Sequence, residues 1–163
     1  MAGVCDNRIV MWEDIGNTWN GEVAADMYET AVKEALEKCR PGKKPPKSGK
    51  KGKKGWLVLE DNDPAGYKSN LAKAAKKKVG IKSMSLPPYS PDLNPLDYSI
   101  WENISSRMMK KKIVGYEPRV AYAKRLRLTA LRTPKKFIAK AMGDMKARIK
   151  MVIEKKGNAV PKD

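Results

Sequence analysis

Residues 85 to 98 read Ser85-Leu86-Pro87-Pro88-Tyr89-Ser90-Pro91-Asp92-Leu93-Asn94-Pro95-Leu96-Asp97-Tyr98. Each proline fixes the backbone angle φ at about −65°, so the proline-rich part of this stretch is a stiff turn. Asn94 is a favoured N-cap residue and Pro95 suits the first helical position, which predicts that a helix begins here. Asp97 then lies in the first turn of that helix.

A second carboxylate lies upstream, at the end of an apolar run. Residues 56–59, Trp-Leu-Val-Leu, are continuous as in a strand buried on both faces, and Asp61 follows soon after. Residues 68–79 predict a short helix, and residues 81–86 alternate as in a second core strand. This order predicts a parallel crossover. The helix is expected to turn Leu71, Ala74 and Ala75 inward and Lys73, Lys76, Lys77 and Lys78 outward.

The N-terminal part predicts one strand and one helix. Residues 8–12 form a short apolar run typical of a strand. Asn20-Gly21 is a turn pattern, so residues 19–23 are expected to pair back on this strand as a hairpin. Asp26 is expected to cap a helix of about three turns. Its apolar stripe would be Tyr28, Val32, Ala35, Leu36 and Cys39.

The C-terminal half predicts three helices. The first continues from Leu96 through Ile100, Ile104 and Met108, one apolar residue in every turn. A further helix is expected over residues 118–131. The last begins at Thr133-Pro134 and ends near Gly157. Its seam is expected to comprise Ile138, Met142, Met145, Ile149 and Val152.

The balance of charge favours a polyanionic partner. Among 163 residues, 35 Lys and Arg stand against 18 Asp and Glu, a net charge of +17. Nucleic acid is the usual partner of such a chain, although a basic surface that serves solubility is the simpler alternative. There is no His and there are only two Cys, so a Cys/His zinc site is excluded. No apolar run approaches a membrane span, and the N-terminus lacks the apolar region of a secretion signal.

Residues 40–55 form a Lys/Gly/Pro-rich basic loop that has no apolar side chain with which to build a core. It is either a solvated surface loop or an arm that neutralises phosphates. The residues expected to bind nucleic acid are Lys43, Lys44, Lys47, Lys50, Lys51, Lys53 and Lys54 in the arm, and Lys135, Lys136, Lys140 and Arg148 in the basic helices of residues 118–157.

Asp61 and Asp97 are the candidate catalytic and metal-binding residues. Phosphoryl transfer by two metal ions needs carboxylates held close together, and Mg²⁺ prefers oxygen ligands. A strand-end Asp and a helix-start Asp could converge on one ion. Taken alone, the spacing is equally compatible with a turn residue and a first-turn acid that favours the helix dipole.

The motifs strengthen the metal-site interpretation. Residues 59–64, Leu-Glu-Asp-Asn-Asp-Pro, followed by Pro-Pro-Tyr-Ser-Pro-Asp-Leu-Asn-Pro-Leu-Asp at 87–97, resemble the catalytic core of mariner-type transposases. The likeness covers roughly residues 8–160. It implies an α/β, truncated ribonuclease H-like fold, with a few strands, flanking helices and a helical C-terminal half, as a single domain over residues 1–163. It also implies that Asp61 and Asp97 correspond to the second and third catalytic Asp of the family, which would use Mg²⁺ or Mn²⁺.

The departures from the family lower the expectation of activity. The family's first catalytic Asp lies on a strand for which this chain shows no counterpart before residues 10–12. Gly66 stands where the family usually has His. A trimmed sheet would leave an edge for protein neighbours to cover. We therefore expect Asp61 and Asp97 to be vestiges of a metal site, in a protein that is not an enzyme.

Three functions remain open at this point. The first is a transposase-derived, domesticated nucleic-acid-binding protein, in the nucleus. The second is a structural RNA-binding subunit of a large ribonucleoprotein such as an organellar, for example mitochondrial, ribosome. The third is an active metal-dependent DNA strand-transferase. All three predict an intracellular protein that binds DNA or RNA and no membrane.

Overall fold

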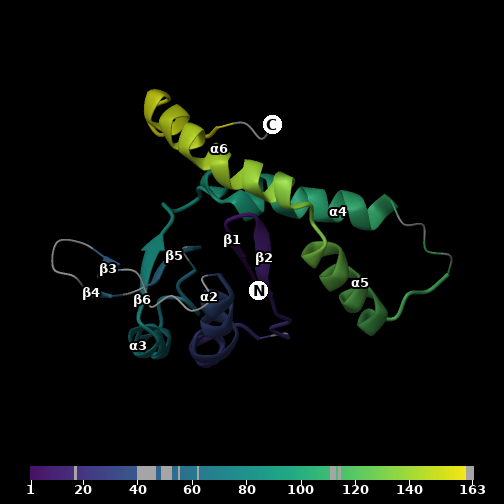
Figure 1. Ribbon diagram of the computed structural model, residues 1–163, viewed down its shortest axis with the longest axis horizontal. Helices are drawn as coiled ribbons and strands as arrows, with labels where there is room; N and C mark the ends of the chain where they lie inside the picture. The colour runs from purple at the N-terminus through teal and green to yellow at the C-terminus, as the bar shows by residue number, and fades with distance from the viewer. Residues whose placement is uncertain are drawn as a thin grey trace. The chain divides into compact units, whose positions relative to one another are not determined.

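The computed structural model describes residues 1–16, 18–39, 47–48, 53–54, 56–61, 63–110, 113 and 115–160. It divides into two compact units, whose elements are labelled in Figure 1. Unit 1 comprises Met1–Gly3 and Glu13–Pro88, and unit 2 comprises Val4–Trp12 and Tyr89–Asp163. No helix in the described part of the chain is both long and apolar enough to cross a membrane.

The N-terminal strand pairs differently from the prediction. β2 (Arg8–Trp12) confirms the expected strand, but its partner is β1 (Ala2–Cys5). The Asn20-Gly21 pattern starts a helix instead of a hairpin, because the Asn20 Oδ1 accepts the N–H groups of Glu22 at 3.1 Å and Val23 at 3.0 Å. The predictions of a strand at residues 19–23 and of a cap at Asp26 are therefore wrong.

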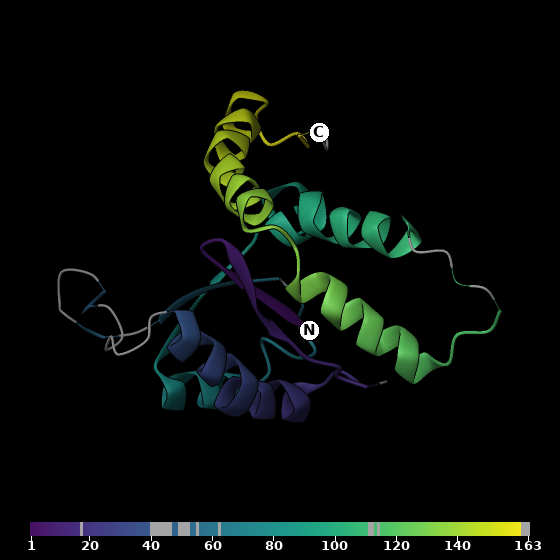
Figure 2. The same cartoon turned by 45° about the vertical axis from the view of Figure 1, so that its right-hand side comes forward.

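In unit 1, a long helical run covers a crossover. The run comprises α1 (Gly21–Met27), a π-helical turn η1 (Tyr28–Val32) and α2 (Lys33–Cys39). The crossover comprises β5 (Trp56–Glu60), α3 (Asn70–Val79) and β6 (Ile81–Ser85), and the two strands are parallel with Trp56 opposite Ile81. Figures 1 and 2 show α3 beside the α1–α2 run, and α3 packs against α1 and η1.

The crossover confirms the predicted order but not the predicted burial. Leu57 of β5 is 66% exposed and Met84 of β6 is 48% exposed, so neither strand is covered on both faces within the described residues. On α3, Leu71 and Ala74 are exposed, whereas Lys76 is buried. The assignment of these three side chains from the helical pattern was therefore wrong.

Two very short strands lie within the basic loop. β3 (Lys47–Ser48) pairs antiparallel with β4 (Lys53–Lys54). The predicted binding residues Lys43, Lys44, Lys50 and Lys51 lie outside the described residues. For Lys47, Lys53 and Lys54 the structure describes the strand backbone.

Unit 2 consists mainly of helices, some of which pack against strand β2. A 3₁₀ turn η2 (Pro91–Leu93) leads into a π-helical turn η3 (Leu96–Ile100), which continues as α4 (Trp101–Lys110). α5 (Arg119–Leu131) and α6 (Lys135–Glu154) follow, and both pack against β2. The core comprises Ile9, Tyr98, Ile100, Ile104, Met108, Ala130, Ile138 and Ala141.

The stripe from Leu96 to Met108 is confirmed, but the seam of α6 is only partly as predicted. Ile138 is buried, whereas Ile149 is 41% exposed and the adjacent Arg148 is only 2% exposed. The buried side of α6 is therefore rotated from the predicted seam. The stop at Gly157 is confirmed, because its φ is 90° and its N–H bonds the Val152 carbonyl at 2.8 Å.

Candidate functional site

Asp61 is exposed and directly follows a strand end that is anchored by a buried ionic network. The preceding residue, Glu60, is 8% exposed. Its Oε1 accepts the Tyr28 hydroxyl at 2.5 Å, and its Oε2 accepts the Lys76 ammonium at 2.5 Å. Lys76 also donates to the Tyr67 carbonyl at 2.8 Å. The network joins β5, η1 and α3, so it fixes the backbone from which Asp61 projects.

The Tyr28 hydroxyl of this network and the phenol of the neighbouring Tyr67 both have raised pKa values and remain protonated at neutral pH. Burial, together with the nearby Asp61 and Glu60 carboxylates, raises the pKa of Tyr67 to about 12. Burial and then the hydrogen bond to Glu60 raise the pKa of Tyr28 above its usual value. The Lys76 ammonium lies 4.7 Å from the centre of the Tyr28 ring, a cation–π contact that partly compensates for its burial.

The turn after Asp61 is held by an indole. Trp19 Nε1 donates to Asp63 Oδ2 at 2.8 Å, and the Gly66 N–H donates to the same oxygen at 2.9 Å. Burial raises the pKa of Asp63, but the hydrogen bonds from Gly66, Trp19 and Ala65 outweigh it, so the pKa lies below its usual value. A Cβ on Gly66 would lie 2.2 Å from Trp19 Nε1. Trp19 therefore occupies the space that any side chain at position 66 would need.

In unit 2, Asp97 lies where the local sequence predicts. The Asn94 Oδ1 accepts the Leu96 N–H at 3.1 Å, which confirms Asn94 as the helix cap. The Asn94 Nδ2 donates to Asp97 Oδ2 at 2.7 Å. The cap thus also orients the Asp97 carboxylate.

The turn that carries Asp97 is held from the C-terminal side. The Asp92 carboxylate accepts the Val160 N–H at 2.8 Å. The Arg148 Nη1 donates to the Asp92 carbonyl at 3.4 Å, and its guanidinium lies 4.1 Å from the centre of the Tyr98 ring. Because Arg148 is buried in these contacts, the prediction that it belongs to an exposed phosphate-binding face is wrong.

A metal ion has no complete set of ligands among the residues that the structure describes. Carboxylate oxygens suit Mg²⁺ or Mn²⁺, as Asp61 and Asp97 would require. However, no group of three or more His, Cys, Asp and Glu side chains in the described ranges is placed to hold an ion. Asp61 belongs to unit 1 and Asp97 to unit 2. We therefore derive no metal-dependent step from these residues.

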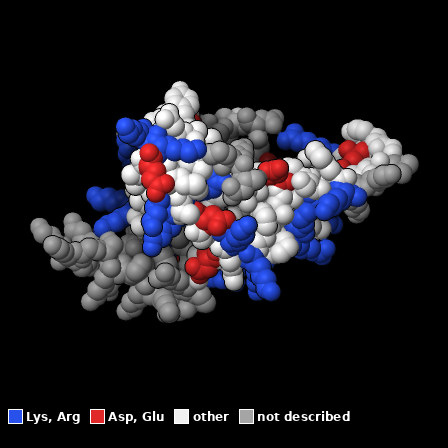
Figure 3. Space-filling model, turned by 90° about the horizontal axis from the view of Figure 1, so that it is seen from above, with Lys and Arg blue, Asp and Glu red and all other residues white. Residues whose placement is uncertain are grey.

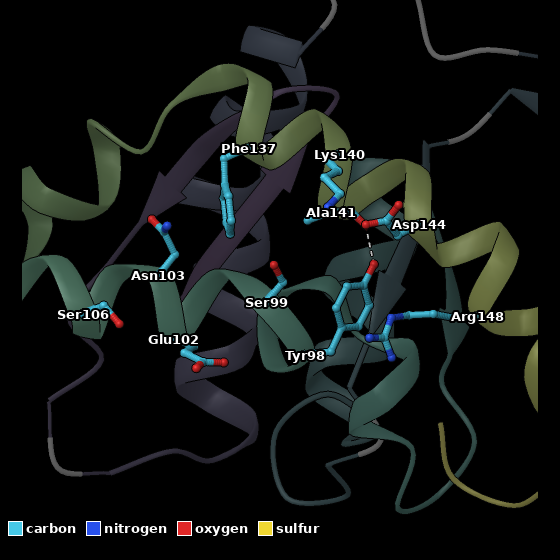
Figure 4. A pocket seen from close by; sticks show the side chains of 10 residues that line it. All are labelled: Tyr98, Ser99, Glu102, Asn103, Ser106, Phe137, Lys140, Ala141, Asp144 and Arg148. Carbon is cyan, nitrogen blue, oxygen red and sulfur yellow. Dashed lines mark hydrogen bonds between the residues drawn. The ribbon is translucent and has the colours of Figure 1, made fainter. Parts of the chain in front are cut away.

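A cavity of about 330 Å³ lies in unit 2, between the start of the α4 helix and α6. Figure 4 shows its lining, including the hydrogen bond from the Tyr98 hydroxyl to the Ala141 carbonyl. Glu102 and Asp144 line it beside Lys140, and neither carboxylate has an ion pair among the described residues. The two carboxylates offset the two cations of the lining, Lys140 and Arg148, so this cavity has no excess of positive charge to attract a nucleic-acid backbone.

The remaining predicted binding residues are on the surface of α6. Lys135, Lys136 and Lys140 are exposed, and Lys140 also lines the cavity with the two carboxylates. Sequence reasoning missed the roles of Trp19 and of the buried Lys76. The only sequence pattern that could have indicated Lys76 is its position four residues after Ala72 and one after Ala75, on the buried side of α3.

Comparison with solved structures identifies the fold of the chain. No protein-family model and no curated protein matches the chain. A solved structure of the Mos1 transposase catalytic domain with raltegravir and Mn matches it with a TM-score of 0.75 over 96% of this chain and 74% of that one. The chain has the fold of the Mos1 mariner transposase catalytic domain. The predicted ribonuclease H-like α/β fold is thereby confirmed.

Two further Mos1 structures show how far the similarity extends. The catalytic domain of Mos1 mariner transposase matches with a TM-score of 0.72 at 18% identity, covering 96% of this chain and 72% of that one. The Mos1 mariner paired-end complex with Mn also has a TM-score of 0.72, at 17% identity, and this chain covers 43% of that one. At such identities the Mos1 likeness establishes the fold alone.

Proposed function

We propose that the chain is a transposase-derived protein that binds nucleic acid and does not cleave it. The observation that carries the proposal is a net charge of +17 on the fold of a mariner transposase catalytic domain. One of the similar structures is a transposase complex with a transposon end. A fold suited to nucleic acid, combined with an excess of cations, supports nucleic acid as the partner here.

A protein with such an excess of Lys and Arg binds nucleic acid mainly through its phosphates. Lys and Arg stand out in more places than Asp and Glu on the face shown in Figure 3. Each phosphate that is neutralised releases counterions, so affinity depends steeply on salt and only weakly on sequence. The basic loop of residues 40–55 and the exposed Lys135 and Lys136 remain the proposed contacts from the sequence.

The proposal that the chain does not cleave nucleic acid rests on the number of its catalytic carboxylates. The motifs supply counterparts for two of the family's three catalytic Asp residues, Asp61 and Asp97. A two-metal site needs carboxylates that hold both ions. Two carboxylates alone leave the ions short of protein ligands, so binding without chemistry is the function that these residues support.

A salt titration tests the proposal. Fluorescence anisotropy with labelled duplex DNA, single-stranded DNA and RNA would be measured from low to physiological salt. The logarithm of the binding constant should fall linearly with the logarithm of salt concentration, with a slope of about −0.9 for each phosphate contacted on duplex DNA. Affinity that does not change with salt, or no binding to any of the three, contradicts the proposal.

The same titration separates the two cellular settings. Preference for duplex DNA supports a domesticated transposase in the nucleus. Preference for RNA supports the ribonucleoprotein alternative in a mitochondrion or another organelle, and sedimentation of the native protein with ribosomal particles would then be the decisive measurement. Protein neighbours that cover the exposed strands of unit 1 would co-sediment in that case.

A further inference from the structure

A continuous segment of unit 2 carries cations without any acid. From Pro118 to Gly143 the sequence contains no Asp and no Glu. Glu117, the acid just before this segment, is paired with Arg125, with distances of 2.8 Å and 2.6 Å between their nitrogen and oxygen atoms. The cations of the segment are Arg119, Lys124, Arg125, Arg127, Arg132, Lys135, Lys136 and Lys140.

Three of these cations on α5 are available to a partner. Lys124, Arg127 and Arg132 are exposed, and no side-chain hydrogen bond or ion pair holds them in the described part of the chain. Arg125 differs, because it also donates to the Met108 carbonyl at 3.1 Å and so belongs to the packing of α4 and α5. On α5, the available charge therefore lies on the outer side of the helix.

Helical spacing places apolar residues among these cations. Val120, Lys124, Arg127 and Leu131 are separated by four, three and four residues, so they share one side of the helix. Val120 is 80% exposed, Leu128 42% and Leu131 44%, whereas Ala130 on the other side is fully buried in the core. We call this surface the α5 outer face, comprising Val120, Lys124, Arg127, Leu128, Leu131 and Arg132.

We propose that the α5 outer face is a contact of unit 2 with nucleic acid, beside the exposed Lys135 and Lys136 of α6. Lys124, Arg127 and Arg132 bind phosphates, while Val120, Leu128 and Leu131 lie against sugars and base edges. Charge complementarity carries this assignment, which rests on the proposed function. The cavity between α4 and α6 is a weaker place for phosphate, because its carboxylates, Glu102 and Asp144, offset its cations, Lys140 and Arg148.

The arrangement of α5 favours nucleic acid over a lipid surface. A helix that lies in a membrane interface separates a wide apolar face from a cationic one. On the outer side of α5, the cations alternate with the exposed apolar residues Val120, Leu128 and Leu131. A phosphate backbone with sugars between its charges matches such a mixed surface better than a bilayer does.

The test compares two triple variants with the same change in net charge. The first carries Lys124→Gln, Arg127→Gln and Arg132→Gln. The control carries Lys146→Gln, Lys150→Gln and Lys155→Gln, which are exposed residues of the second half of α6 and its end. Salt titrations of both variants against the preferred nucleic acid of the wild type give affinity and salt slope. Because none of the six side chains has a partner among the described residues, both variants should melt like the wild type.

The α5 variant should lose about 0.9 of salt slope for each phosphate contact removed, up to roughly 2.7 in total on duplex DNA, and at least about tenfold in affinity. The single variant Arg127→Gln should lose about 0.9. If the α5 variant and the control lose the same slope and affinity, the assignment to α5 is wrong while the proposed function stands. A wild type that binds anionic phosphatidylserine vesicles but no nucleic acid overturns both.

Discussion

At the scale of single residues, Trp19 and Gly66 form a steric pair. The indole donates to Asp63 and fills the space beside Gly66, so the absence of a side chain at position 66 is a packing requirement of this chain. The family resemblance leads to an expected His there. The sequence alone showed the departure, and the structure shows that Trp19, 47 positions upstream in the same unit, accounts for it.

Substitution Gly66→Ala should destabilise unit 1 by about 1–3 kcal/mol, the usual cost of overpacking. The new Cβ would meet Trp19 at 2.2 Å. Urea denaturation followed by circular dichroism measures the change. Gly143→Ala is the control, because nothing lies within 4 Å of its Cβ, and it should stabilise α6 by roughly 0.5–1 kcal/mol. A Gly66→Ala variant as stable as the wild type would contradict the packing of Trp19.

Substitution Lys76→Met should destabilise the protein by about 3–5 kcal/mol, because it leaves the Glu60 carboxylate buried without its cation. The exposed neighbour gives the control, since Lys77→Met should change stability by less than about 0.5 kcal/mol. Adding Glu60→Gln to Lys76→Met should recover part of the loss. Urea denaturation of the wild type, Lys76→Met, Glu60→Gln and the double variant forms a double-mutant cycle. Equal losses for Lys76→Met and Lys77→Met would argue against the buried pair.

At the scale of elements, local sequence rules located the crossover and the C-terminal helices but not β1 or the start of α1. Asn94 and Pro95 set the start of the α4 region, and Gly157 ends the run of α6, because caps act through neighbouring backbone groups. The prediction at Asn20-Gly21 was wrong for a related reason. The same dipeptide suits a hairpin turn and a helix start, and only the path of the following chain distinguishes them.

Arg107 of α4 holds the C-terminal end of α5. Its guanidinium donates to the Thr129 carbonyl at 2.9 Å, to the Thr133 hydroxyl at 3.2 Å and to the Arg132 carbonyl at 3.2 Å. Arg107→Gln should therefore destabilise unit 2 by about 1.5–3 kcal/mol, as expected for hydrogen bonds from a charged group. Hydrogen exchange at the α5 end should quicken.

Arg107→Lys should not restore protection, because a single ammonium cannot reproduce the forked geometry of a guanidinium. The control is Lys110→Gln, an exposed residue of the same helix. An unchanged rate of amide hydrogen exchange in Arg107→Gln would show that the Arg107 hydrogen bonds do not stabilise the C-terminal end of α5.

At the scale of the whole molecule, the two relevant features are the net charge and the division into two compact units. The net charge of +17 is a property of composition and needs no structure. The carboxylates of the two motifs belong to different units, and no complete metal-binding group occurs among the residues described. At this scale the proposal of nucleic-acid binding rests on the charge.

We expect no Mn²⁺-dependent strand cleavage by this chain above that of its Asp61→Asn and Asp97→Asn variants. Two carboxylates do not complete a two-metal site, so removing either should change little. A plasmid-nicking assay with Mn²⁺ or Mg²⁺ measures this, with nucleic-acid binding as the check that all three proteins are folded. Nicking by the wild type that both Asn variants lose would establish an active centre.

The sequence by itself determined the order strand, helix, strand of the crossover, the three C-terminal helices, the position of Asp97 in a first helical turn and the excess of positive charge. These depend on composition, on side-chain periodicity and on neighbours a few residues away. Only the tertiary structure decided that Lys76 and Arg148 are buried, since a periodic pattern treats every cation as a surface residue. Their burial depends on Glu60 and on Tyr98, partners that are distant in the chain and that only folding brings into contact.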